Sequence, residues 1–460
     1  MTGYGQAARE ALNFIESQRT GAVWRTNDHP KARPAYSLYH GAGGVILLLL
    51  ELHAQSGEAE LMEKALAAGD EILAQLPTFE DLSINSSTGW GGYVFVLGEL
   101  ARISGQARYR EGATFCLRKI RELAQPLGAG VGWIEPAPFA DITGFSEPRE
   151  VYDQSVGSAG VILTLLYAAR EGLDDKALAL AVAAAERLLE VAEPTPDGLR
   201  WRMMADMPFQ FTAPNFAHGG AGVGYALLQL HRATGEPRYL DAAIDAARYA
   251  MSRSHPVGSG RLVCHNEDTR KPIFYLGACH GPAGTGRLLL ELHAVTGDAQ
   301  WAQALDQLVA GIEGAGAPEA RSAGFWNNHG QCCGDAGVGE FALLLARRTG
   351  KAEYLDLARR CAAVILESSE TSGGERFWRQ AEHRDRPEFV QAQTGYMQGA
   401  AGIASFLHHL GGVEGGRAVK LAMPDWPDMG GVSWVADTKK PPSERLGAWK
   451  AWVRGQDLNL

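Results

Sequence analysis

Three cysteines of this 460-residue chain have the types and positions to bind a metal ion. Cys332 and Cys333 are adjacent, and Cys279 and Cys332 each stand two residues before a Gly-x-x-Gly pattern. Three thiolates from two neighbouring loops suit a soft, four-coordinate cation, of which zinc is the first choice. The alternative is buried loop cysteines that match by coincidence, but their shared register favours a metal site.

The Gly-x-x-Gly pattern occurs seven times, and an apolar run follows each copy. The first glycines are Gly41, Gly89, Gly157, Gly219, Gly281, Gly334 and Gly399. Sixteen residues later, five copies have the glycine of a Ser-Gly or Thr-Gly pair, as at Ser56-Gly57, and Gly415 keeps this offset in the seventh copy. Intervals of this size indicate an array of similar supersecondary units.

Each unit has the pattern of a helical hairpin. The apolar run, as at residues 161–166, predicts a helix that is buried on all sides. The glycine pair allows close backbone approach at its start, and the Ser/Thr-Gly pair is expected to end it and cap the next helix. The following stretch, such as residues 238–251, mixes charged residues with alanine, which predicts an outer helix with a solvent face.

Seven such hairpins predict an all-α protein with the architecture of an α,α-toroid, two concentric rings of helices. The terminal repeats of an open solenoid would be unusually polar. The first and last repeats of this chain are not, which favours a closed ring. The repeats define a toroid domain over residues 1–413. The tail, residues 414–460, fits no eighth repeat and contains four tryptophans, so we expect it to pack back on the toroid. Docking of a leader peptide or partner enzyme is the alternative for the tail.

In a toroid, the loops before the inner helices meet at one end, so the residues just before the glycines should converge there. Directly before the glycines stand His40, Thr88, Val156, His218, His280, Cys333 and Gln398. One residue earlier stand Tyr39, Ser87, Ser155, Ala217, Cys279, Cys332 and Met397. Loops on a rigid scaffold commonly carry function, so this end is the expected site. The long loop at residues 126–150 is a candidate cover for it.

Composition excludes several classes of function. A net charge of −10 and the lack of a long basic cluster argue against a nucleic-acid partner. The longest apolar run, residues 45–50, is too short to span a membrane, and no signal-peptide pattern is found, so the cytoplasm is expected. Cysteines there are commonly reduced. Cys116 and Cys361 are expected to be buried in outer helices, whereas Cys264 could line the site or be an ordinary loop cysteine.

The motifs Cys279-His280-Gly281 and Cys332-Cys333-Gly334 resemble the two metal motifs of the lanthionine synthetase C-like (LanC-like) cyclases. The resemblance covers residues 4–411 and implies an α,α-toroid of seven hairpins with a zinc ion held by protein ligands. It implies ligand roles for Cys279 and Cys332. The second motif is usually Cys-His-Gly. Here it reads Cys-Cys-Gly, which is similar to a subset of lanthionine synthetases that use three cysteines, and this implies a ligand role for Cys333.

The resemblance extends to residues with catalytic roles in the family. His218 and Asp153 match its active-site His and Asp, which implies acid/base catalysis; a histidine satisfied by backbone and a helix cap are the alternatives. His280 is implied to support the metal site without ligating, because a fourth protein ligand would close the site to substrate. Tyr275 stands where some members have Arg, so a role that rests on that Arg is not expected here.

The implied function is that of a zinc-dependent cyclase. Zinc deprotonates a bound thiol, and the thiolate of a peptide Cys would add to dehydroalanine or dehydrobutyrine to form lanthionine or methyllanthionine. The substrate would be a dehydrated precursor peptide. No dehydratase or kinase module precedes the repeats, so a separate dehydratase or kinase-lyase is expected as partner. Addition of glutathione or another free thiol, and a non-catalytic peptide-binding scaffold, are the alternatives.

Overall fold

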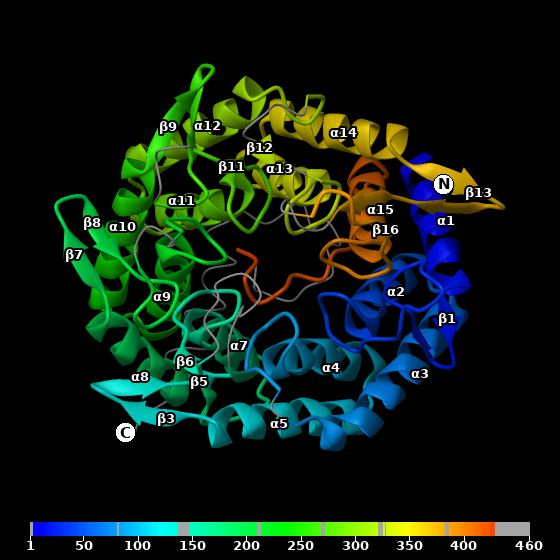
Figure 1. Cartoon of the computed structure of the whole chain (residues 1–460), viewed down its shortest axis with the longest axis horizontal. Coiled ribbons are helices and arrows are strands. Elements are labelled where there is room, and N and C mark those ends of the chain that lie inside the picture. The colour runs from blue at the N-terminus through cyan, green and yellow to red at the C-terminus, as the bar shows by residue number, and fades with distance from the viewer. Residues whose placement is uncertain are drawn as a thin grey trace.

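The computed structural model describes residues 3–80, 82–136, 147–208, 213–267, 272–320, 325–326, 328–381 and 386–427. Within these ranges, fourteen α-helices form two concentric rings (Figure 1). The predicted all-α toroid is therefore confirmed. The inner ring consists of α2 (Ala42–Ser56), α4 (Trp90–Ser104), α7 (Ser158–Arg170), α9 (Gly220–Thr234), α11 (Pro282–Thr296), α13 (Asp335–Thr349) and α15 (Ala400–Glu414).

The seventh helix of the outer ring comes from a different part of the chain than the repeats predict. Its members are α1 (Gly3–Ser17), α3 (Ala59–Gln75), α5 (Ala107–Glu122), α8 (Ala177–Glu190), α10 (Pro237–Ser252), α12 (Ala299–Gly314) and α14 (Ala352–Glu367). Six of them pack on the inner helix that they follow, but α1 packs on α15. Gly415 therefore opens no outer helix in the structure. Because α15 also contacts α2, the ring closes between the first and last repeats.

The Ser/Thr-Gly pairs end the inner helices as predicted, but they do not cap the outer ones. Gly57 adopts a left-handed conformation with φ of 75°, which favours glycine at a helix C-terminus. The Ser56 hydroxyl donates to the Leu52 carbonyl at 2.9 Å and accepts from the Glu58 N–H at 3.2 Å. Because α3 begins at the next residue, this hydroxyl bridges the two helices and does not reach the N–H groups inside α3.

The second glycine of the repeat pattern is required by a close approach between each inner helix and the loop before it. A Cβ atom on Gly222 would lie 1.9 Å from the Phe216 carbonyl oxygen, and one on Gly284 would lie 1.9 Å from that of Ala278. No side chain can be accommodated at such distances. The glycines thus allow the loops to pack tightly against the inner ring. This packing fixes the positions of the residues that precede each Gly-x-x-Gly pattern.

Short antiparallel hairpins decorate the periphery (Figure 1). They are β1 (Arg19–Thr20) with β2 (Val23–Trp24), β3 (Gln125–Leu127) with β4 (Gly130–Gly132), β7 (Glu193–Thr195) with β8 (Gly198–Arg200), β9 (Ser254–Val257) with β10 (Gly260–Val263), and β13 (Glu370–Ser372) with β14 (Glu375–Phe377). Strand β4 packs on α8. The start of the predicted site cover therefore lies on the outer ring, and residues 137–146 lie outside the described residues.

A tryptophan repeatedly anchors the strand region to the preceding outer helix, a feature the sequence reading missed. The indole N–H of Trp133 donates to the Ile120 carbonyl at 2.8 Å, thirteen residues earlier. The same bond, at 2.7 Å and the same separation, joins Trp201 to Leu188 and Trp378 to Ile365. All three indoles are buried, so the bonds satisfy polar groups that would otherwise be unpaired.

Three further strand pairs occur: β5 (Ile134–Glu135) with β6 (Arg149–Glu150), β11 (Phe274–Tyr275) with β12 (Phe325–Trp326), and β15 (Arg379–Ala381) with β16 (Val390–Ala392). After α15, residues 417–427 turn toward the centre of the ring (Figure 1). Residues 428–460 lie outside the described residues. The division of the chain into residues 1–413 and 414–460 stays a prediction.

Candidate metal centre and functional site

A series of backbone hydrogen bonds joins the loops that precede the inner helices. The N–H of Cys279 donates to the Cys332 carbonyl at 3.1 Å, and the N–H of Cys332 donates to that of Met397 at 2.9 Å. The same kind of bond runs from Ser155 to Ala217, Ala217 to Cys279, Met397 to Tyr39, and Tyr39 to Ser87. These are the seven positions that stand two residues before the glycines. Their predicted convergence is confirmed, and it explains why Cys279 and Cys332 are neighbours.

The three predicted ligand cysteines form one cluster. The Sγ atoms of Cys279 and Cys333 lie 3.1 Å apart, and those of Cys333 and Cys332 lie 3.5 Å apart. All three lie within 4.8 Å of one another. A tetrahedral zinc ion with Zn–S bonds of ~2.3 Å needs sulfur atoms about 3.8 Å apart, so the thiols require only small shifts to hold one. The residues present therefore fit a zinc ion with three thiolate ligands.

The cluster favours a thiolate at one of its three cysteines, Cys332. Hydrogen bonds from the Cys279 and Cys333 thiols lower the pKa of Cys332 well below its usual value. Two side chains from the first and seventh repeats complete the surroundings: the hydroxyl of Tyr39 lowers the pKa of Cys332 further, and Gln398 Nε2 lies 3.8 Å from Cys333 Sγ and 3.0 Å from that hydroxyl. The sequence analysis gave neither residue a role, although both stand at converging positions.

His218 and Asp153 form a hydrogen-bonded pair in the next loops of the ring. Asp153 Oδ2 lies 2.8 Å from His218 Nδ1, while Asp153 Oδ1 accepts from the N–H groups of Val156 and Gly157 at 2.7 and 3.0 Å. Asp153 thus orders its own loop and orients His218. It makes no side-chain cap bond to α7, and its role in acid/base catalysis stays a prediction. Burial alone would lower the pKa of His218, but Asp153 and Cys332 raise it above its usual value.

His280 lies beside this pair and is oriented by a residue that the sequence analysis missed. Its Nδ1 is 3.0 Å from Asn215 Oδ1, and the Asn215 amide donates to the His280 carbonyl at 2.7 Å. The ring of His280 lies 5.0 Å from that of His218 and 4.2 Å from that of His265. Asn215 occupies the same repeat position as Asp153, four residues before the glycine, and this register was the available signal.

The other cysteines have structural surroundings. Cys116 lies in α5 and Cys361 in α14, both fully buried, as predicted. Cys264 is also buried, its thiol donates to the Arg253 carbonyl at 3.3 Å, and burial raises its pKa to about 11. Of its two predicted alternatives, the structure supports the ordinary loop cysteine. Its neighbour His265 lines the central cavity, as does Tyr275.

These groups surround a central cavity of about 780 Å³. Cys279, Cys332, Cys333, His218 and His280 line one part of it, and the C-terminal residues 420–426 line another. Because the three thiols and the His218 imidazole line the same space, a ligand held there can contact both. Within the described ranges, no helix is both long and apolar enough to cross a membrane.

The fold and the site together define an α,α-toroid with a thiol cluster in its central cavity. The family model "Lanthionine synthetase C-like protein" matches residues 34–412, so the chain belongs to the lanthionine synthetase C-like family. No curated protein matches the sequence significantly.

A solved structure of nisin cyclase supports the fold. The structure of nisin cyclase superposes with a TM-score of 0.62 at 16% identity, over 92% of this chain and 97% of that chain. A D-mannose isomerase matches with a TM-score of 0.49 at 13% identity, over 89% and 97% of the two chains. A GH76 α-mannanase from Bacteroides thetaiotaomicron matches with a TM-score of 0.46 at 12% identity, over 88% and 94%. At 16% identity, the likeness to nisin cyclase concerns the fold alone.

Proposed function

We propose that this protein is a zinc-dependent lanthionine and methyllanthionine cyclase, which adds peptide Cys thiolates to dehydroalanine or dehydrobutyrine in a ribosomal peptide. The cluster of three thiols beside the Asp153–His218 pair carries this proposal. Cys279, Cys332 and Cys333 would hold the zinc ion, leaving one position for the substrate thiol. When bound, zinc supplies a stable thiolate near neutral pH, because coordination removes the thiol proton.

The chain's own residues account for the proton transfers. His218 is the proton carrier: it accepts the proton that leaves the substrate thiol and then donates a proton to the α-carbon of the former dehydro residue. Asp153 stabilises the charged imidazolium of His218 between these steps. Because Asp153 is hydrogen-bonded to Nδ1 of His218, the proton is accepted and donated at Nε2. One S–Cβ bond forms as the C=C π bond breaks, and no electrons are gained or lost overall.

His280 is proposed to position the site. Its Nδ1 is bonded to Asn215, and its ring contacts His218, so it restricts the orientation of the catalytic imidazole. Dehydrated precursor peptide is the proposed substrate, prepared by a separate dehydratase or kinase-lyase. The cavity of about 780 Å³ is large enough to take a segment of peptide, which supports a substrate of this class.

The test is thioether formation on a pre-dehydrated peptide that bears one cysteine, followed by thiol alkylation and mass spectrometry. Wild-type protein should accelerate ring closure above the uncatalysed rate. His218→Ala should keep its zinc and reduce the enzymatic rate by roughly 10²–10⁴-fold, the usual contribution of a positioned acid or base. If the reaction is accelerated only when glutathione is added, the protein is instead an enzyme that joins free thiols to dehydroamino acids. No acceleration with either would leave a binding scaffold.

A further inference from the structure

The last described part of the chain crosses the centre of the inner ring. We call residues 420–426 the crossing segment. Its first residues lie against α2, α13 and α15, and its last residues reach α11. A turn in which the Trp426 N–H donates to the Met423 carbonyl at 2.8 Å ends it. The segment therefore runs inside the toroid from the side formed by α2, α13 and α15 to α11.

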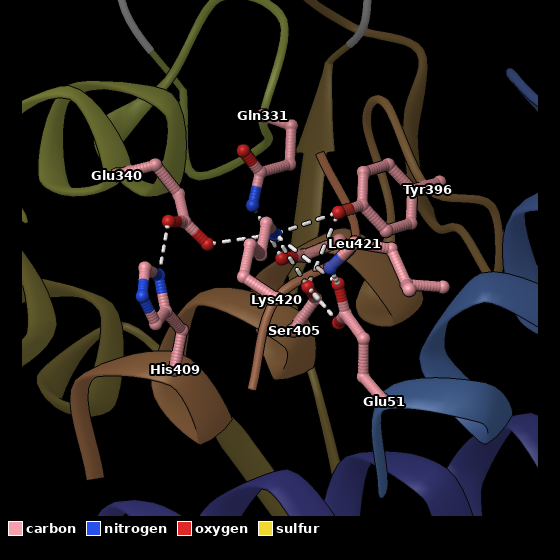
Figure 2. Close-up of polar contacts among 9 residues, drawn as sticks. Glu51, Gln331, Glu340, Tyr396, Ser405, His409, Lys420 and Leu421 are labelled. Atoms are coloured by element: carbon pink, nitrogen blue, oxygen red, sulfur yellow. Dashed lines mark hydrogen bonds and ion pairs between the residues drawn. The ribbon is translucent and has the colours of Figure 1, made fainter. Parts of the chain in front are cut away.

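Lys420 anchors the start of the crossing segment in a buried polar network (Figure 2). Its ammonium group donates to Tyr396 Oη at 2.7 Å and Ser405 Oγ at 2.6 Å, and it forms an ion pair with Glu340 Oε1 at 2.8 Å. The next backbone N–H, that of Leu421, donates to Glu51 Oε1 at 2.9 Å. Three inner helices and the loop before α15 thus bind two consecutive residues of the segment.

The charges of this first anchor support one another. Burial alone would raise the pKa of Glu340, but Lys420 and His409 lower it to about 2, so Glu340 is ionised. Burial alone would lower the pKa of Lys420, but Glu340 and Glu51 raise it above its usual value, so Lys420 stays charged. A paired ammonium with several acceptors is the arrangement in which a buried lysine is stable.

A second anchor fixes the end of the crossing segment. Asp425 Oδ2 lies 2.9 Å from Nη1 of Arg287, a buried residue of α11. The Arg287 guanidinium also lies 4.3 Å from the Trp426 ring centroid and 5.3 Å from that of Phe216, in cation–π contacts. Phe216 stands two residues before His218. The end of the segment is therefore connected through Arg287 to the loop that carries the proposed proton carrier.

The two anchors fix how far the crossing segment lies, along the helix axes, from the N-termini of the inner helices. Glu340 and Arg287 are each the sixth residue of their helices, so they lie ~8 Å along the helix axis from the N-termini. The loops with the cysteines stand at those N-termini. Leu421, Met423, Pro424 and Trp426 of the segment line the same cavity as the three thiols. The segment thus forms an apolar floor beneath the metal centre.

We propose that the crossing segment is a specificity determinant: its side chains limit the size of the residue that a bound peptide places beneath the cysteines. The inference rests on the proposed function, since it assumes that a dehydrated peptide enters this cavity. Small residues between the dehydro residue and the cysteine would fit above the floor, whereas an aromatic residue there would meet Met423 and Trp426. Anchoring at both ends keeps the floor from yielding to a larger side chain.

Trp426→Ala tests this role, because it removes the largest side chain of the floor and leaves the Lys420 and Asp425 anchors in place. Cyclisation is measured on two pre-dehydrated peptides that differ only in an Ala or a Trp between dehydroalanine and cysteine. Wild-type protein should prefer the Ala peptide in kcat/KM, and the variant should reduce this preference by at least roughly tenfold, through faster reaction of the Trp peptide. Met423→Ala should shift the ratio in the same direction. Trp301→Ala, which removes a buried indole of α12 that does not line the cavity, is the control.

Calorimetric affinities for unreactive peptides, with Ser for Cys and Ala for dehydroalanine, separate this inference from the proposed function. A shifted affinity ratio in Trp426→Ala without turnover by any protein would support the floor and refute the cyclase. The floor would be overturned if peptides react or bind but the ratio between the Ala and Trp peptides is the same as in wild type in both Trp426→Ala and Met423→Ala. An equal shift in Trp301→Ala, or failure of every peptide to bind or react, would also overturn it.

Discussion

Replacing Lys420 by Met removes the charge from the buried network and keeps an unbranched stem of similar length. At the 2.8 Å ion-pair distance and an effective dielectric constant of ~20, the attraction between Lys420 and Glu340 amounts to ~6 kcal/mol, part of which offsets the desolvation of both ions. In the variant Glu340 is left buried without its main cation. Such a loss typically destabilises a protein by ~3–5 kcal/mol.

The effect is measurable as a lower melting temperature. With an unfolding entropy of ~2.1 cal/mol/K per residue, 460 residues give ~1 kcal/mol/K, so Tm should fall by about 3–5 °C in differential scanning calorimetry. Adding Glu340→Gln to Lys420→Met should recover part of the loss, because the uncompensated charge is gone. The control is Lys351→Met, which breaks an exposed ion pair with Asp306 and should change Tm by less than about 1 °C. If Lys420→Met melted like Lys351→Met, the buried network would not anchor the segment.

Four further outcomes are expected. Purified protein should contain about one zinc per chain by elemental analysis; Cys279→Ala or Cys332→Ala should empty the site and Cys264→Ala should not, whereas full occupancy in Cys332→Ala would refute the ligand assignment. Cys333→His should keep zinc but slow cyclisation, because the centre loses one negative charge; faster cyclisation would reverse this argument. Asp153→Asn removes a charge that raises the pKa of His218, so the acid limb of the kcat/KM profile should move to lower pH, and an unmoved limb would separate Asp153 from catalysis. Burial and His409 lower the pKa of His408 to about 4, so the unfolded chain binds the extra proton and stability should fall by up to about 3 kcal/mol as pH drops from 6.5 to 4; His408→Leu should flatten this slope in denaturant titrations, and an equal slope would refute it.

The repeat architecture was predictable because its signals are local. Close packing of a loop on an inner helix leaves no room for a Cβ, so glycines recur at fixed spacing, as Gly222 and Gly284 do. Five inner helices end at a left-handed glycine, so Gly57 and its equivalents recur sixteen residues after the first glycine of the repeat. The convergence of the cysteines followed from the same register. Asn215 and Tyr39 stand in that register too, but the sequence gives no sign of which side chain a polar atom will meet.

Long-range contacts decided the features that local sequence patterns do not predict. The sequence repeats the inner-helix signal seven times, yet only closure of the ring places α1 on α15 and frees the chain after Gly415 from forming an outer helix. The hydrogen bond that orients His218 joins it to Asp153, 65 positions away, and no local pattern reveals this contact. Lys420 reads as an ordinary polar tail residue, and only the folded ring surrounds it with Glu340 and Glu51. The sequence by itself therefore determined the helices, the ring and the thiol cluster, which arise from short-range periodicity. Tertiary structure alone decided the partners of buried charges and the path of residues 417–427, because these depend on groups brought together only when the toroid closes.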